Sequence, residues 1–108
     1  MLVGHIQPSD LVTQQGQTVE FSCQTDVLAS INWNFIPTAA QNEIRIVTGG
    51  SLVESFDNKF MLNSNATTSV LTIMEISVSD SGSYVCIENL GFGERSSSEL
   101  IVLGKCKN

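Results

Sequence analysis

Few residues of this 108-residue chain could do covalent or metal chemistry. Its three cysteines lie at positions 23, 86 and 106, and its single histidine is His5, near the N-terminus. Zinc sites and thioredoxin-type centres need clustered Cys and His ligands or a Cys-x-x-Cys motif, and the sequence has neither. The first two cysteines are 63 positions apart. A long-range cysteine pair in a small, strand-rich chain is instead typical of a disulfide formed in an oxidising compartment.

Catalytic constellations are also missing from the sequence. His5 has no plausible serine or cysteine partner, which a hydrolytic triad would require. The carboxylates are scattered along the chain, and no glycine-rich phosphate loop is present. We therefore expect a protein that is not an enzyme and that has no cofactor, no metal and no small-molecule substrate.

The charge balance narrows the choice of partner. The chain has 11 acidic and 5 basic side chains, a net charge of −6. Such a surface repels phosphate backbones and anionic membranes, so we expect no nucleic-acid partner. The opening Met-Leu-Val-Gly-His is not a signal peptide, and no apolar run approaches the roughly 20 residues of a membrane helix. We expect one excised domain of a longer protein, secreted or on the extracellular side of the plasma membrane, attached only through an anchor outside this sequence.

Residue composition and patterning predict the elements that position these groups. The chain has 10 Val, 9 Ile and 8 Thr against 4 Ala, which favours an all-β fold. Turn signals recur every eight to twelve residues, as in a sandwich or barrel. Strict alternation in Thr18–Cys23 and Ser30–Ile36 predicts inward-facing Val19, Phe21 and Cys23, then Ile31, Trp33 and Phe35. Further strands are expected at Leu2–Ile6, Leu11–Thr13, Glu43–Thr48, Leu52–Glu54, Lys59–Leu62, Ser69–Met74, Gly82–Glu88 and Ser97–Leu103.

A combination of cysteine, tryptophan and tyrosine residues indicates one particular all-β fold. In Asp80-Ser-Gly-Ser-Tyr84-Val-Cys86 the tyrosine lies two residues before the cysteine, which is the tyrosine-corner arrangement. With Cys23 and Trp33 on adjacent strands, residues 2–103 resemble the immunoglobulin superfamily. The resemblance implies an immunoglobulin-like β-sandwich, a V-type Greek key of two antiparallel sheets, over residues 1–104, followed by a tail at 105–108. It also implies a Cys23–Cys86 disulfide between the sheets, Trp33 packed on it, and a Tyr84 hydroxyl bonded to backbone.

The chain looks like a V-set domain, with an I-set domain as the nearest alternative. The Cys23–Cys86 spacing leaves room for two additional strands, C′ at Glu43–Thr48 and C″ at Leu52–Glu54. Lys59-Phe60 matches the pair that opens strand D in variable domains, which implies an ion pair between Lys59 and Asp80; the alternative is an unpaired surface lysine. Ile36 replaces the glutamine usual in antigen receptors, and the Phe-Gly-x-Gly joining signature is absent in register. These departures indicate a divergent, antigen-receptor-like variable domain.

One sheet face is the first candidate for binding. If Trp33 and Cys86 point inward, their neighbours on the same strands point outward from one sheet. That sheet contains strands C (Ser30–Ile36), F (Gly82–Glu88) and G (Ser97–Leu103), and we call its outer side the GFC face. The predicted interface residues there are Asn32, Asn34, Ile36, Val85 and Ile87. Three aliphatic side chains on one face indicate an interface. The alternative is that one or two of them are covered by strand C′ or the FG loop.

Three further residues are candidates outside that face. Phe92, between two glycines at the tip of the FG loop, could anchor binding or fold back on the domain. Asn65-Ala-Thr67 is a glycosylation sequon. Cys106 could form a disulfide with another chain or a following domain. The alternative is a thiol that is unpaired only because of where the chain was cut.

Two functional hypotheses follow. The first is an extracellular V-type recognition domain of an immune-type, antigen-receptor-like cell-surface protein that binds a protein ligand or a second V domain and forms a homodimer through its GFC face. The second is a structural cell-adhesion module in a string of similar domains. Fold alone does not choose between them, because function resides in particular surfaces.

Overall fold

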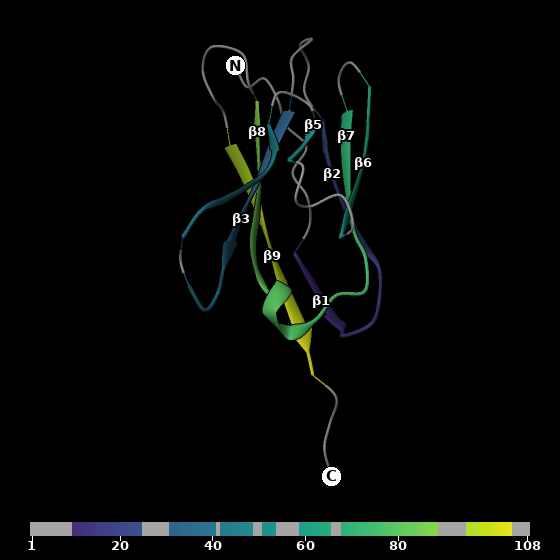
Figure 1. The fold of residues 1–108 in the computed structure, drawn as a ribbon, viewed down its shortest axis with the longest axis vertical. Helices are drawn as coiled ribbons and strands as arrows, with labels where there is room; N and C mark the ends of the chain where they lie inside the picture. Colours follow the sequence, from purple (N-terminus) through teal and green to yellow (C-terminus); the bar gives the residue numbers. More distant parts are fainter. Residues whose placement is uncertain are drawn as a thin grey trace.

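The computed structural model describes residues 10–24, 31–40, 42–48, 51–53, 59–65, 68–88 and 95–104. Its strands form a larger sheet of order β1-β9-β8-β3-β4-β5 and a smaller sheet of order β2-β7-β6 (Figure 1). The elements are β1 (Leu11–Gln14), β2 (Val19–Gln24), β3 (Ile31–Pro37), β4 (Ile44–Thr48), β5 (Ser51–Leu52), β6 (Phe60–Ser64), β7 (Thr68–Ile73), the 3-10 turn η2 (Val78–Asp80), β8 (Gly82–Glu88) and β9 (Arg95–Leu103). Over these residues, no helix has the length and apolar character to cross a bilayer.

The all-β sandwich predicted from the sequence is confirmed. Each predicted strand that falls within the described residues is present, with ends that differ by at most two residues. The predicted stretch Leu2–Ile6 lies outside the described residues. The ladders are antiparallel except one, because β1 runs parallel to β9 and pairs Leu11 with Leu100.

Alternation along the strands builds the core, and one bulge departs from it. In β2 the odd-numbered residues are buried and the even-numbered ones exposed. In β4, however, the consecutive residues Ile46 and Val47 are both buried. The register between β3 and β4 shifts between Trp33 and Asn34, so the extra residue of a β-bulge turns two neighbours toward the same side. This shift lets β4 contribute two adjacent side chains to the core.

The centre of the sandwich is bridged twice at one level. A disulfide joins Cys23 of β2 to Cys86 of β8, with a Cα–Cα distance of 6.5 Å. Trp33 lies opposite Cys86 in the larger sheet, and Ser69 lies opposite Cys23 in the smaller one. The indole Nε1 of Trp33 donates a hydrogen bond to Ser69 Oγ at 2.9 Å. A covalent bond and a buried hydrogen bond therefore connect the same two sheets side by side.

Tyr84, two residues before Cys86 on β8, fills the neighbouring part of the core. Its ring is buried and stacks on Phe35 and Phe21, with centroid distances of 4.5 and 5.4 Å. The hydroxyl donates a hydrogen bond of 2.7 Å to the backbone carbonyl of Asp80. Burial raises the pKa of Tyr84, with a smaller contribution from the charge of Asp80. The phenol therefore remains a neutral donor that secures η2 to β8.

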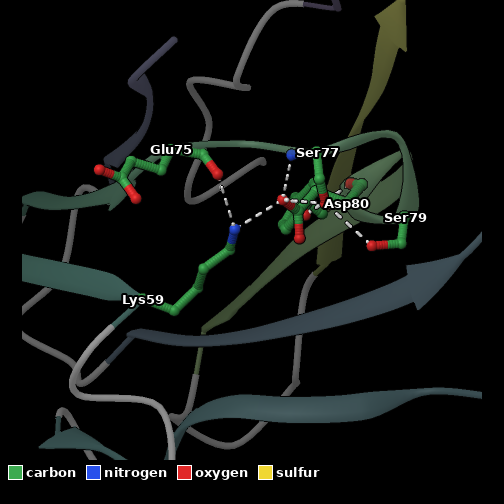
Figure 2. A network of polar contacts seen from close by, with 6 residues as sticks. Lys59, Glu75, Ser77, Ser79 and Asp80 are labelled. Carbon is green, nitrogen blue, oxygen red and sulfur yellow. Dashed lines mark hydrogen bonds and ion pairs between the residues drawn. The ribbon is translucent and has the colours of Figure 1, made fainter. Parts of the chain in front are cut away.

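Lys59 and Asp80 join the two sheets at one end of the sandwich (Figure 2). The Nζ of Lys59, just before β6, lies 2.7 Å from Asp80 Oδ2 and donates a second hydrogen bond of 3.2 Å to the carbonyl of Glu75. The same Asp80 oxygen accepts the backbone N–H of Ser77 at 2.7 Å. Both side chains are partly buried, so the ion pair is better shielded from solvent than a surface pair.

Gly82, the first residue of β8, permits the close approach of β3. Its φ is +151°, and it pairs with Pro37. A Cβ atom on this backbone would overlap the carbonyl oxygen of Ile36 and lie 2.9 Å from the Pro37 Cα. Only glycine fits the position without a shift of one strand against the other.

Gly82→Ala should therefore lower the free energy of unfolding by about 3 kcal/mol, because steric overlap and backbone strain add. Gly16→Ala is the matched control. Gly16 also has a positive φ, +91°, but a Cβ there meets nothing within 4 Å, so we expect a loss of only about 1 kcal/mol. Urea denaturation of both variants measures the difference. Equal losses would show that the contact with β3 does not matter.

Candidate functional site

The β3–β8 ladder brings four of the predicted interface residues together. Asn32 lies opposite Ile87, and Ile36 lies opposite Ser83 four pairs further along, with Asn34 between them on β3. Asn32, Asn34, Ile36 and Ile87 are all partly exposed on the outer face of the larger sheet. These residues form the middle of the GFC face, which comprises the outward side chains of β4, β3, β8 and β9.

Val85 departs from the prediction that three aliphatic residues make an exposed patch. It lies opposite Asn34 and Ser97, on the outward side of β8, but only 3% of its surface is accessible. It is absent from the core cluster between the sheets, so other side chains on the outer face cover it. The predicted continuous patch of Ile36, Val85 and Ile87 is therefore wrong, and the burial of Val85 agrees with the alternative in which one of the three is covered. A set of polar side chains also crosses this face.

Glu43 is the centre of that polar set. Its Oε2 accepts hydrogen bonds of 2.7 Å from Asn34 Nδ2 and from Arg95 Nη2. Arg95 lies on β9 and Glu43 just before β4, with β8 and β3 between them in the sheet. The contact must therefore pass over both intervening strands. We call Asn34, Glu43 and Arg95 the Glu43 bridge.

The Glu43 bridge keeps its carboxylate ionised. The hydrogen bond from Asn34, followed by the one from Arg95, lowers the pKa of Glu43 below its ordinary value, and burial opposes this lowering. The charge of Arg45 acts in the same direction. The contribution of the bridge is therefore complete above the ordinary carboxyl pKa and is lost as the pH falls through the lowered value.

A shallow hollow lies beside the bridge. It is open to solvent and combines two amides, two guanidinium groups, a carboxylate, a hydroxyl and two aliphatic side chains. Its lining residues are Asn32, Asn34, Glu43, Arg45, Val47, Thr48, Ile87 and Arg95. Arg45 is exposed and makes no hydrogen bond or ion pair with the described residues. Such a mixture of donors and apolar surface is typical of protein-binding faces, and unlike the largely enclosed, apolar pockets that small molecules occupy.

Sequence reasoning missed Glu43, Arg45 and Arg95. The bridge joins residues 52 positions apart through the reach of two long side chains, and strand spacing carries no signal for that reach. One indication existed, since the only two arginines of an acidic chain fall on outward positions of strands that flank the predicted interface.

The remaining candidates are Asn65, Phe92 and Cys106. Asn65 is exposed after β6, and its Oδ1 accepts the backbone N–H of Thr68 at 3.0 Å, which closes a turn. Phe92, with the FG loop, and Cys106 lie outside the described residues, so their predicted roles stay predictions.

Comparison with known proteins agrees with this architecture. The family model of the immunoglobulin V-set domain matches residues 6–103. The first immunoglobulin domain of mouse SynCAM 2 superposes with a TM-score of 0.74 and 21% identity, over 92% of this chain and 95% of that one. The RIG-5 first immunoglobulin domain, crystallised as a homodimer, has a TM-score of 0.74 and 27% identity over 94% and 95% of the two chains.

A third structure was solved as a complex. The first immunoglobulin domain of Dpr11, bound to DIP-gamma, has a TM-score of 0.74 and 16% identity, over 94% of this chain and 50% of that one. Comparison with curated protein sequences finds no match. The family match extends over nearly the whole sandwich, from before β1 to the end of β9. The chain is a member of the immunoglobulin V-set domain family.

Proposed function

We propose that this domain is an extracellular recognition module that binds a second copy of itself through the GFC face. V-set domains are typically non-enzymatic binding modules outside the cell or at its surface. The observation that carries the proposal is the open hollow beside Asn32, Asn34 and Ile87, on the outer face of the larger sheet. The RIG-5 domain, at 27% identity, supports self-association because it was crystallised as a homodimer.

The chemistry of the face fits a protein partner. Ile36 and Ile87 offer partly exposed apolar surface. The Asn34 amide donates its nitrogen to Glu43, and its oxygen can accept a hydrogen bond from another chain. Interfaces of this kind combine an apolar centre with polar groups around it. The Cys23–Cys86 disulfide is consistent with an oxidising, extracellular setting. The antigen-receptor-like assignment made from the sequence is narrower than this proposal and is not needed for it.

A structural module in a string of domains is the second candidate. Three exposed apolar side chains on β1 and β9 favour it: Val12, Ile101 and Leu103, with 60%, 45% and 47% of their surfaces accessible. They lie along the outer side of the β1–β9 ladder, where Val12 faces Ile101. A neighbouring domain packed there would bury them, and such a module would not need to form dimers.

Sedimentation velocity over a range of protein concentrations separates the two candidates. The proposal predicts a dimer, and Ile87→Glu should weaken it by about 30-fold or more, because a charge replaces apolar contact area at the centre of the interface. Ile36→Glu should act in the same direction. Met61→Glu, at an exposed position on β6 of the other sheet, is the matched control and should leave the dimer unchanged. A wild-type domain that remains monomeric at all concentrations would contradict the proposal and favour the string module.

A further inference from the structure

We infer that self-pairing is specified by a charge contact in which Arg45 of one copy meets Glu99 of the other. This inference rests on the proposed function, because it assigns the residues that determine the register of the same dimer. It follows from the charged side chains of the GFC face, and in particular from those that form no ion pair among the described residues.

Arg45 is the unpaired cation of the described residues. Lys59 is neutralised by Asp80, and Arg95 is neutralised by Glu43. Arg45 is exposed in β4, lines the hollow, and makes no ion pair or hydrogen bond there. It acts on Glu43 only through the field of its charge. A guanidinium left with open donors at the edge of a binding face matches the bidentate geometry of a carboxylate.

Glu99 is the corresponding unpaired anion. It is exposed on β9, and its side chain is engaged only by a long hydrogen bond of 3.3 Å from Ser83 Oγ. Its backbone N–H is bonded to Asp10 Oδ1 at 2.9 Å, so a second carboxylate lies close by. No described cation forms an ion pair with either acid. This side of the face is therefore acidic, while the β4 side presents Arg45.

The strand order places the two charges at opposite sides of one face. Arg45 is on β4 and Glu99 on β9, with β3 and β8 between them. Three strand spacings separate their backbones by roughly 14 Å. In the ladders, Arg45 is level with Asn34, Val85 and Ser97, so Glu99 is two residues further along β9. That offset is about 7 Å, within reach of an arginine side chain.

Two-fold symmetry turns this separation into self-complementarity. Consider two copies that meet face to face about a two-fold axis in the dimer interface. If this axis runs along the strands, above the line between β3 and β8, then β4 of each copy lies over β9 of the other. An isologous interface repeats every contact, so one Arg45–Glu99 pair implies two per dimer. Each copy has a net charge of −6, and general repulsion opposes association. A specific attraction at two points would fix the register in which that repulsion is overcome.

A charge-reversal exchange tests the inference. Arg45→Glu and Glu99→Arg, each made alone, should weaken self-association by about 100-fold, because like charges then meet at two points. Mixed together, the two variants should form a heterodimer close to the wild-type affinity, since one copy presents carboxylates at both positions and the other presents guanidinium groups at both. Glu20→Arg, on the exposed side of β2 in the other sheet, is the matched control and should dimerise as the wild type does or slightly better. Sedimentation velocity measures each case, and urea denaturation checks that every variant is folded.

The possible outcomes separate the inference from the proposed function. A wild-type dimer that survives both charge reversals would overturn the Arg45–Glu99 contact and leave pairing through the GFC face in place. Two variants that each lose the dimer but fail to pair with one another would also overturn it. A monomeric wild-type domain would overturn the proposed function, and this inference with it.

Discussion

Trp33→Ala is expected to lower the free energy of unfolding by about 4 kcal/mol. Trp33 is fully buried at the level of the disulfide, and truncation of an aromatic core residue removes its apolar contacts and leaves a cavity. The substitution also removes the donor that bonds Ser69 Oγ at 2.9 Å in the opposite sheet. Urea denaturation followed by circular dichroism measures the loss. A change below 2 kcal/mol would mean that the indole does not support the core as its burial implies.

Two further variants separate packing from hydrogen bonding at this position. Trp33→Phe keeps an aromatic ring but no donor, so we expect a smaller loss than for Trp33→Ala. Ser69→Ala leaves the indole N–H buried without its partner, which should cost about 1–3 kcal/mol. If Ser69→Ala is neutral, packing alone explains the effect of Trp33.

Removal of the disulfide has the second large expected effect. The Cys23→Ala, Cys86→Ala double variant should be less stable by about 4 kcal/mol, because the bond closes a loop of 63 positions and restricts the unfolded chain. That loss is comparable to the entire stability of a marginal domain. Urea denaturation of the oxidised protein and of the double variant, both with Cys106→Ser to prevent thiol exchange, gives the comparison. A loss below about 1.5 kcal/mol would contradict the chain-entropy account.

The fold could be predicted because its signals are local. Alternation in β2 and β3 is a short-range pattern, and the residues around Tyr84 identify a corner that recurs throughout one superfamily. The resemblance to variable domains at Lys59-Phe60 implied the Lys59–Asp80 contact, which is present at 2.7 Å. The alternation and the tyrosine corner depend on backbone geometry that a few neighbouring residues determine, whereas the ion pair was implied by family resemblance.

The surface of the binding face could not be predicted in the same way. Alternation correctly turns Val85 outward, but it does not indicate that this side chain is covered or that Arg95 reaches over two strands to Glu43. The adjacent burial of Ile46 and Val47 depends on a register shift against β3. Such effects arise from strand order and side-chain length together. They appear only when distant segments are placed side by side.

The parallel pairing of β1 with β9 delays completion of the larger sheet while the chain is being synthesised. Leu11 and Leu100 are 89 positions apart, yet they are neighbours in one ladder. At about 5–20 residues per second, a ribosome makes the second of these strands roughly 4 to 18 seconds after the first. During that interval β1 has no strand to pair with in its own sheet. Completion of the larger sheet therefore waits for the end of the domain, so a stalled or shortened nascent chain would expose an open β-edge to chaperones and proteases.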